Sequence, residues 1–143
     1  MYRPRPSLPP VNEPPPRLEG VNVLVVDDEY DSVELVAASL RQFGAIVRTA
    51  FSAAEALGLL DDEWPHVVVC DLAMPLVSGI AFVRRLRTLE ATFDRRVRVV
   101  ALTGFTDEAH GVEALASGFD VHVPKPFDPL TFATVVAMLA GRC

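Results

Sequence analysis

The sequence predicts a doubly wound α/β domain in which helices cover both faces of a five-stranded parallel sheet. Five apolar runs of strand length alternate with five stretches of helical character, as in repeated strand–helix units. Most of these runs are apolar at successive positions rather than at alternate ones, which indicates strands that are mostly apolar on both faces and buried between helices. The length of 143 residues suits one such domain with one core.

The alternation begins with a strand, a helix and a second strand. Residues 21–26 read VNVLVV, an apolar run of strand length. Residues 30–43 place apolar side chains three and four positions apart, which is the spacing of one helix face. The next run, IVRTA at residues 46–50, predicts the second strand.

A capping signal marks the second helix, which is expected over residues 52–60. Ser52 and Glu55 stand three residues apart and form a capping box, which satisfies backbone N–H groups of the first turn. The third strand, VVVCD at residues 67–71, ends on the carboxylate of Asp71. A carboxylate at the end of a buried strand is costly unless it is paired, hydrogen-bonded or bound to metal. Asp71 therefore needs a partner or a function.

Two more strands and three helices complete the pattern. The third helix is expected over residues 79–89, with apolar side chains on one face, and the strand VRVVAL follows at 97–102. A fourth helix is expected over 106–117, and VHV at 121–123 is the fifth strand. The last helix starts at Asp128, an N-cap residue followed by a proline in the first helical position.

Residues 1–18 differ from the rest of the chain because they contain seven of its twelve prolines. Such a segment offers no plausible strand or helix and is typical of a polyproline-like tail or linker. We therefore place the domain at residues 19–143.

Composition and charge exclude several function classes. The net charge of -6 argues against a nucleic-acid groove, which normally shows a basic patch, and favours a basic or cationic partner. No apolar run approaches the roughly 18 residues of a membrane span, and no secretory signal is recognisable, so we expect a cytoplasmic protein that does not cross a membrane. The two cysteines, Cys70 and Cys143, form neither a disulfide framework nor a metal-type spacing.

Polar side chains follow four of the five predicted strands. Asp27 and Asp28 come after the first strand, Asp71 ends the third, Thr103 follows the fourth and Lys125 the fifth. Right-handed crossovers bring the carboxyl ends of parallel strands to one edge, where the sites of such folds form. Clustered carboxylates repel one another unless a cation is present, and their oxygen ligands suit Mg²⁺. The sequence therefore predicts a Mg²⁺ site at this edge.

Four motifs occur together in the predicted domain: VLVVDDE at 23–29, DLAMPLVSG at 71–79, ALTG at 101–104 and PKPF at 124–127. In this combination the chain resembles the receiver domain of two-component response regulators over residues 21–140, most of all the C-terminal receivers of hybrid histidine kinases. The resemblance implies a flavodoxin-like sheet with strand order 2-1-3-4-5. It also implies that a histidine kinase or phosphotransfer protein phosphorylates Asp71.

The same resemblance assigns a metal set at the strand ends. Asp28 and Asp71 would hold Mg²⁺ with the backbone carbonyl of Ala73, and Asp27 would orient a metal-bound water. Thr103 and Lys125 would contact the phosphoryl group.

His122 stands three residues before Lys125, where receivers usually carry an aromatic side chain that moves inward with the threonine. It is either a switch residue or a strand histidine without that role. In receivers the bond that corresponds to Lys125–Pro126 is cis. A cis bond there would aim the ammonium group at the site.

The sequence favours a phosphorylation-controlled signalling switch that catalyses only its own phosphorylation and dephosphorylation and is not otherwise an enzyme. The alternative is an aspartyl-nucleophile phosphatase or a nucleotide-binding enzyme on a similar fold. Such a phosphatase needs a second acid two residues after Asp71, where Ala73 stands, and the glycine-rich loops of nucleotide-binding folds are missing. We expect no output domain in this chain, which would be either a free-standing regulator or the receiver of a hybrid kinase.

The last predicted helix carries no charge between Asp128 and Arg142, although a solvated helix normally has charges on its outer face. We expect its surface, beside the fifth strand, to contact a second copy, a kinase domain or the proline-rich tail. The side chains expected to face the sheet are Phe132, Val135, Val136 and Leu139, and those expected to face outward are Leu130, Ala133, Thr134, Ala137 and Met138.

Overall fold

A computed structural model of the chain describes residues 15–72, 79–103 and 118–142. Five strands form one parallel sheet in the order β2-β1-β3-β4-β5, which confirms the predicted fold class and strand order. All strand bounds lie within one residue of the prediction. The strands are β1 (Asn22–Val26), β2 (Ile46–Ala50), β3 (Val67–Asp71), β4 (Arg98–Thr103) and β5 (Val121–Pro124).

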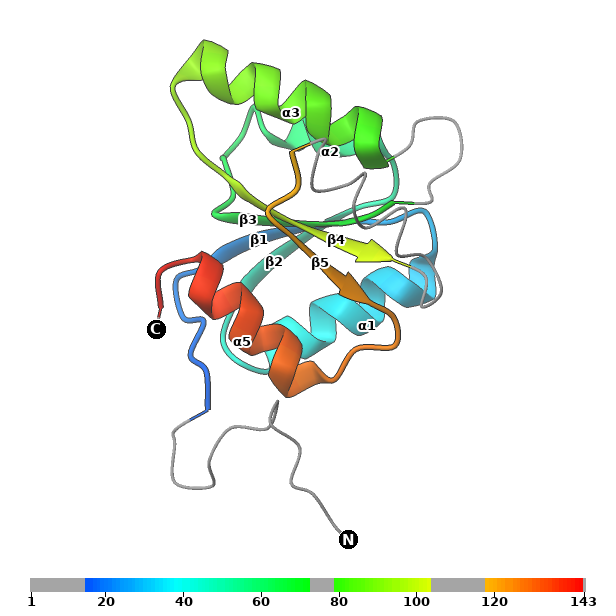
Figure 1. Ribbon diagram of the computed structural model, residues 1–143, viewed down its shortest axis with the longest axis vertical. Coiled ribbons are helices and arrows are strands. Elements are labelled where there is room, and N and C mark those ends of the chain that lie inside the picture. Colours follow the sequence, from blue (N-terminus) through cyan, green and yellow to red (C-terminus); the bar gives the residue numbers. More distant parts are fainter. Residues whose placement is uncertain (1–14, 73–78, 104–117, 143) are drawn as a thin grey trace, which may run out of the picture.

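Helices cover both faces of this sheet. Figure 1 shows α1 and α5 on one face and α2 and α3 on the other. The fourth predicted helix, over residues 106–117, falls outside the described residues. Among the residues that are described, no helix is long and apolar enough to cross a membrane. The four described helices are α1 (Tyr30–Arg41), α2 (Ala53–Leu59), α3 (Gly79–Phe93) and α5 (Pro129–Leu139).

Two apolar clusters fill the space between the sheet and the helices, one on each face. Along β1, Val23 and Val25 belong to the cluster beneath α1 and α5, and Leu24 and Val26 belong to the cluster beneath α2 and α3. All four side chains are 1% exposed or less, and each contributes roughly 2 kcal/mol by its burial. An interior strand with apolar side chains on both faces therefore holds the two helix layers together.

Both predicted N-caps are confirmed. The hydroxyl of Ser52 accepts the backbone N–H of Glu55 at 3.1 Å. The carboxylate of Asp128 accepts the backbone N–H and the hydroxyl of Thr131 at 2.9 and 2.8 Å, and Pro129 follows as the first helical residue. These caps set where α2 and α5 begin.

Two helices end at different positions from those predicted. α1 ends at Arg41, two residues early, and Gly44 beyond it has a φ of 101°. α3 continues four residues further, to Phe93. Its end is defined by Asp94, whose φ is 52°, and the next backbone N–H bonds back to the carbonyl of Glu90 at 2.9 Å. A left-handed residue followed by this bond is the usual way in which a helix closes, and apolar spacing does not reveal it.

The orientation of α5 also differs from the prediction. Ala133 and Ala137, expected to face outward, are buried, with exposures of 0% and 3%. Val135 and Leu139, expected against the sheet, are only half-buried. The reason is that α5 packs against α1 as well as against the sheet, and small alanines let the two helices approach closely. Met138, 62% exposed, remains the exposed large hydrophobic side chain of this helix.

Leu18, the last residue that the sequence assigns to the tail, packs into the core with no exposed surface. Its backbone N–H donates to the carbonyl of Phe43 at 2.8 Å, and its carbonyl accepts the N–H of Val21 at 2.9 Å. The chain thus joins the domain slightly before Glu19. The tail itself stays a prediction, since residues 1–14 fall outside the described ranges.

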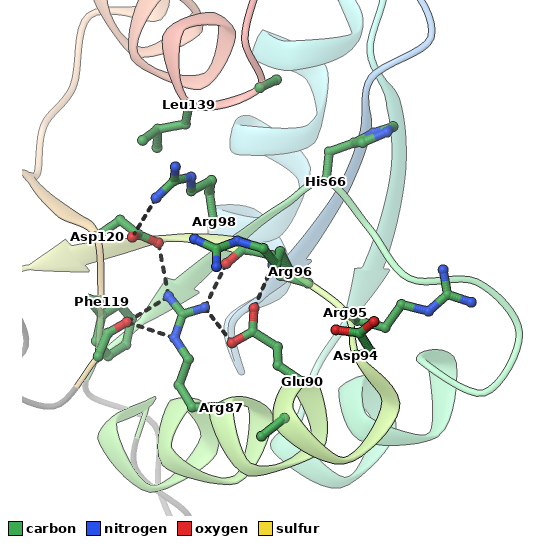
Figure 2. Close-up of a pocket in the computed structure, with 14 residues that line it drawn as sticks. His66, Arg87, Glu90, Asp94, Arg95, Arg96, Arg98, Phe119, Asp120 and Leu139 are labelled. Atoms are coloured by element: carbon green, nitrogen blue, oxygen red, sulfur yellow. Dashed lines mark hydrogen bonds and ion pairs between the residues drawn. The ribbon is translucent and has the colours of Figure 1, made fainter.

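A polar cluster fastens α3 to the amino ends of β4 and β5 (Figure 2). Arg87 donates to the carbonyls of Val97 and Gly118 and to the carboxylates of Glu90 and Asp120 at 2.6–3.0 Å. Charge-assisted bonds of this kind are stronger than neutral ones. The cluster therefore sets the position of α3, whose other end lies against the end of β3.

Candidate functional site

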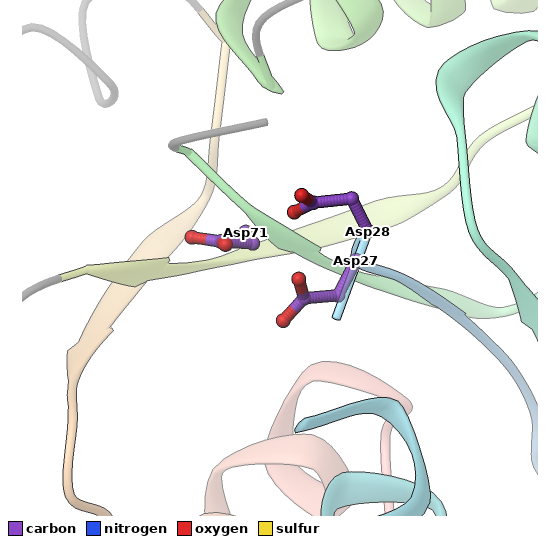
Figure 3. Close-up of side chains that lie close together, drawn as sticks. All are labelled: Asp27, Asp28 and Asp71. Atoms are coloured by element: carbon purple, nitrogen blue, oxygen red, sulfur yellow. The ribbon is translucent and has the colours of Figure 1, made fainter. Parts of the chain in front are cut away.

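Three carboxylates meet at the edge of the sheet where the strands end. Asp27 and Asp28 directly follow β1, and Asp71 is the last residue of β3. Each offers one carboxylate oxygen, and these oxygens lie within 4.8 Å of one another (Figure 3). The convergence predicted from the strand ends is therefore present in the fold for all three acids.

Lys125 completes the cluster from the segment after β5. Its ammonium nitrogen lies 3.7 Å from Oδ2 of Asp27 and 3.8 Å from Oδ2 of Asp71. The Lys125–Pro126 bond is cis, as the resemblance implies. At these separations the ammonium attracts both carboxylates electrostatically. Among the residues that the structure describes here, one positive charge faces three negative ones, so this part of the pocket has an excess of negative charge.

Of the three acids, Asp27 has the environment that is least favourable for a charged carboxylate. Its side chain is buried at 1% exposure; Oδ1 accepts the backbone N–H of Glu29 at 3.1 Å, whereas the buried Oδ2 has no hydrogen-bond donor among the described residues. Burial raises the pKa of Asp27 to about 6, and the nearby charge of Asp71 adds to this, although the Glu29 bond and Lys125 oppose it. A buried oxygen without a donor is the chemistry that a bound cation would satisfy.

The donor set fits a hard divalent cation. The candidate ligands within the described ranges are carboxylate oxygens, and the exposed Asp28 leaves one side of the pocket open to water and to a substrate. Two oxygens bound directly to one Mg²⁺ can be at most about 4.2 Å apart, twice the metal–oxygen distance. The observed limit of 4.8 Å is therefore compatible with two direct ligands and a third that acts through water.

Gly79 allows α3 to start directly against the end of β3. Its N–H donates to the carbonyl of Leu72 at 3.2 Å. A Cβ at this position would overlap the carbonyl oxygen of Asp71 and lie 3.0 Å from the Cα of Leu72. Only glycine therefore fits between the helix and the residue that carries the central carboxylate.

Cys70 precedes Asp71 but faces the opposite side of the sheet. Its side chain is fully buried in the cluster beneath α2 and α3, and its thiol donates to the carbonyl of Asp71 at 3.3 Å. Burial raises the pKa of this thiol, and the negative charges of Asp71 and Asp27 raise it further. The thiol is therefore neutral and serves as a core side chain.

The remaining predicted site residues are placed only in part. Thr103 ends β4 and pairs in register with Pro124, but its side chain and all of Ala73 lie outside what the structure describes. His122 lies in β5, pairs in register with Ala101 and has an exposed side chain. Its switch role stays a prediction.

An aromatic pair that sequence analysis did not identify lies at the same edge. Tyr30 opens α1, two residues after Asp28, and Phe51 directly follows β2. Their rings are stacked with centroids 5.8 Å apart and planes at 9°, and Tyr30 is 64% exposed. The two residues are far apart in sequence, so only the parallel pairing of β1 with β2 brings them together.

Comparison with known proteins agrees with this arrangement. The family model of the response regulator receiver domain matches residues 23–137. An uncharacterised 14.6 kDa protein from Leptolyngbya boryana is 39% identical over 119 residues, which cover 83% of this chain and 89% of that protein. The phosphate regulon transcriptional regulatory protein PhoB of Pseudomonas aeruginosa is 32% identical over 110 residues, covering 77% of this chain and 47% of PhoB.

Longer relatives and solved structures extend the comparison. Hybrid signal transduction histidine kinase D of Dictyostelium discoideum is 29% identical over 131 residues, covering 87% of this chain but 8% of the kinase. A putative response regulator from Chloroflexus aurantiacus superimposes with a TM-score of 0.79 at 27% identity, covering 85% of this chain and 98% of that one. The receiver domain of NtrX from Brucella abortus gives 0.74 at 31% identity, with coverage of 82% and 96%. The chain thus spans less than half of PhoB and a small part of the hybrid kinase.

Proposed function

The chain belongs to the receiver domain family of response regulators, and from this premise we propose that it is a phosphorylation-controlled switch with Asp71 as the phosphoryl acceptor and Mg²⁺ as its metal. The observation that carries the proposal is the meeting of three carboxylates and one ammonium group at the carboxyl edge of the sheet. Asp71 is the central member, since it is the last residue of β3, the middle strand of the sheet, and lies 3.8 Å from Lys125.

The reaction is a phosphoryl transfer from a phosphohistidine. An ionised oxygen of Asp71 forms a bond to phosphorus while the phosphorus–nitrogen bond of the donor breaks, and the electron pair of that bond stays on the imidazole nitrogen. The other nitrogen of the phosphohistidine ring carries a proton, so the histidine leaves as a neutral imidazole. Asp71 is only 7% exposed, so its carboxylate is held in one place for in-line attack. Lys125, 3.8 Å from the acceptor carboxylate, is positioned to pair with the incoming phosphoryl oxygens.

Asp28 and Asp71 would hold the metal with the carbonyl of Ala73, and Asp27 would orient a bound water. The chemistry that Mg²⁺ supplies when bound is positive charge beside the phosphoryl oxygens. The excess negative charge of the pocket and the buried oxygen of Asp27 without a donor support this assignment.

The partners follow from the family. The phosphoryl donor is a histidine kinase or a phosphotransfer protein in the cytoplasm, and the chain acts on no other substrate. Phosphorylation would change the positions of Thr103, at the end of β4, and His122, in β5. A second copy or a downstream partner would then contact α5 and β5, where Met138 is exposed.

Phosphorylation of Asp71 can be tested directly. Histidine kinases that carry a ³²P-labelled phosphohistidine are incubated with the protein in Mg²⁺ or in EDTA, and the transferred ³²P is measured. In a separate reaction a small acyl phosphate is the donor, and the product is measured by intact mass. We expect an acid-stable, hydroxylamine-labile phosphate in Mg²⁺ that is lost in Asp71→Asn and strongly reduced in Asp28→Ala. Asp62→Asn, an exposed acid on the turn after α2, is the matched control and should be labelled normally. Normal labelling of Asp71→Asn would refute the assignment.

A further inference from the structure

A cavity of about 780 Å³ lies at the edge of the sheet opposite the acidic pocket, where the strands begin. His66 stands just before β3, Arg98 opens β4 and Asp120 stands just before β5, and the ends of α3 and α5 complete the wall. The volume is within the range of small-molecule sites. Figure 2 shows that the side chains around it are mainly charged.

Arg87 forms the inner wall and has no donor left for a ligand. A guanidinium carries five N–H groups, and Arg87 makes five hydrogen bonds, to the carbonyls of Val97 and Gly118 and to the carboxylates of Glu90 and Asp120. These four side-chain and backbone partners fix the position of Arg87. Arg87 therefore supports the wall of the cavity and does not bind a ligand itself.

Arg98 is only partly engaged by the cluster around Arg87. It makes one bond to it, to Asp120 at 3.3 Å, and its side chain is 52% exposed. Most of its N–H groups therefore remain available. His66 adds a neutral donor, because its Nδ1 accepts the N–H of Asn22 at 2.9 Å and its own proton must then lie on Nε2.

Two further guanidinium groups, those of Arg95 and Arg96, line the cavity without any hydrogen bond or ion pair in the part of the chain that is described. Both residues are exposed. Cations just beyond a helix interact favourably with its dipole, so capping of α3 is the simplest alternative role. The carbonyl of Glu90 accepts the backbone N–H of Arg95, and neither arginine side chain bonds to a carbonyl of the helix in the described residues. A dipole interaction of this kind leaves the N–H groups of both guanidinium groups available to a ligand.

The charge balance of the lining favours an anion. Within the cluster around Arg87, two positive and two negative side chains compensate one another. Outside it, Arg95 and Arg96 stand against the single carboxylate of Asp94. The lining is therefore positive by one charge on a chain whose net charge is -6. Local positive charge at a concave site concentrates small anions there.

We propose that this cavity binds a small anion of the diphosphate or polyphosphate class through the guanidinium groups of Arg96 and Arg98, while Arg95 adds positive charge at the rim. Guanidinium forks match pairs of phosphate oxygens, and two forks together suit an anion with several charges. A nucleic acid is a poorer match because the negative field of the whole chain repels a long polyanion, whereas a small anion reaches the cavity alone.

The test is calorimetric titration with inorganic pyrophosphate at low salt, in EDTA and without any phosphoryl donor. We expect a dissociation constant below about 1 mM that is weakened at least tenfold in the double variant Arg95→Gln and Arg96→Gln. The control pair, Arg84→Gln and Arg85→Gln, changes the net charge equally on the exposed face of α3 and should alter affinity less than twofold. Asp94→Asn removes the opposing charge and should tighten binding two- to threefold, since asparagine tolerates the φ of 52°.

Four results would overturn the proposal. They are the absence of binding by the wild-type protein, equal weakening in both double variants, binding of citrate as tight as that of pyrophosphate, and pyrophosphate-induced amide shifts that centre on Asp28 and Leu72 instead of residues 94–98. The first two results would show that Arg95 and Arg96 do not form a binding site, the third that the site does not select phosphate groups, and the fourth that pyrophosphate binds in the acidic pocket. Because no Mg²⁺ and no phosphoryl donor are present, every outcome is independent of the phosphorylation of Asp71.

Discussion

Replacement of Asp27 by asparagine should stabilise the metal-free protein at neutral and alkaline pH. In the folded state the pKa of Asp27 is raised from 3.8 to about 6 by burial. The folded protein therefore holds this proton more tightly than the unfolded chain does. At 1.36 kcal/mol for each pKa unit, the ionised carboxylate lowers the free energy of unfolding by about 3 kcal/mol once the pH is above both values.

The sign and the pH window follow from these two pKa values. Below about pH 4, both states carry the proton and Asp27 has no effect on stability. As the pH rises from about 4 to about 6, the unfolded chain releases the proton first, so the folded state loses stability. Above about pH 6 the full cost remains. Asparagine does not titrate, so the advantage of Asp27→Asn should grow across this window and then stay constant.

The measurement is urea unfolding followed by the fluorescence of Trp64, the single tryptophan, at pH 4, 6 and 8 in EDTA. We expect Asp27→Asn to exceed the wild type by about 2–3 kcal/mol at pH 8 and to differ little at pH 4. Asp62→Asn, at an exposed position, should change stability by less than about 0.5 kcal/mol throughout. Saturating Mg²⁺ should narrow the gap, because bound cation stabilises the wild type. A variant that is less stable than the wild type at pH 8, or a gap independent of pH, would refute the reasoning.

Three other predictions concern packing and contacts. Gly79→Ala should cost about 2 kcal/mol or more in urea unfolding because its Cβ would overlap the carbonyl of Asp71, whereas Gly58→Ala, in an open part of α2, should stabilise by about 0.5–1 kcal/mol; equal effects would contradict this account. Arg87→Met should cost about 2–3 kcal/mol in the same assay, since it leaves two half-buried carboxylates without their main cation, and a loss below about 0.5 kcal/mol would show that the cluster is not stabilising. Met138→Lys should weaken self-association or partner binding at least fivefold in sedimentation analysis, and unchanged association would show that the α5 surface is not an interface.

The alternation of strands and helices is determined by the sequence alone. Runs such as 67–70 are apolar at every position, and the helix spacing in 30–43 is a local property, so neither depends on distant contacts. Once the strands are parallel, their carboxyl ends must share an edge, and this places Asp27, Asp71 and Lys125 together without further information.

The environments of adjacent acids were decided by the tertiary structure. Asp27 and Asp28 are neighbours in sequence and equivalent in chemistry, yet the first is buried at 1% exposure and the second is exposed. Successive side chains at the end of a strand point in opposite directions, and only the packing around β1 determines which direction is buried. The raised pKa of Asp27 therefore has no local signature in the sequence.

The face that α5 buries and the cavity at the amino edge also depend on distant contacts. The sequence of α5 is apolar nearly all round, so its periodicity cannot define one inward face, and contact with α1 selects Ala133 and Ala137. The bonds of Arg87 reach partners up to 33 residues away, on elements that only the folded sheet brings to one edge. Local patterns report which face of a segment is apolar, whereas the pairing of charges and the shape of a cavity are set by where the chain brings separate segments together.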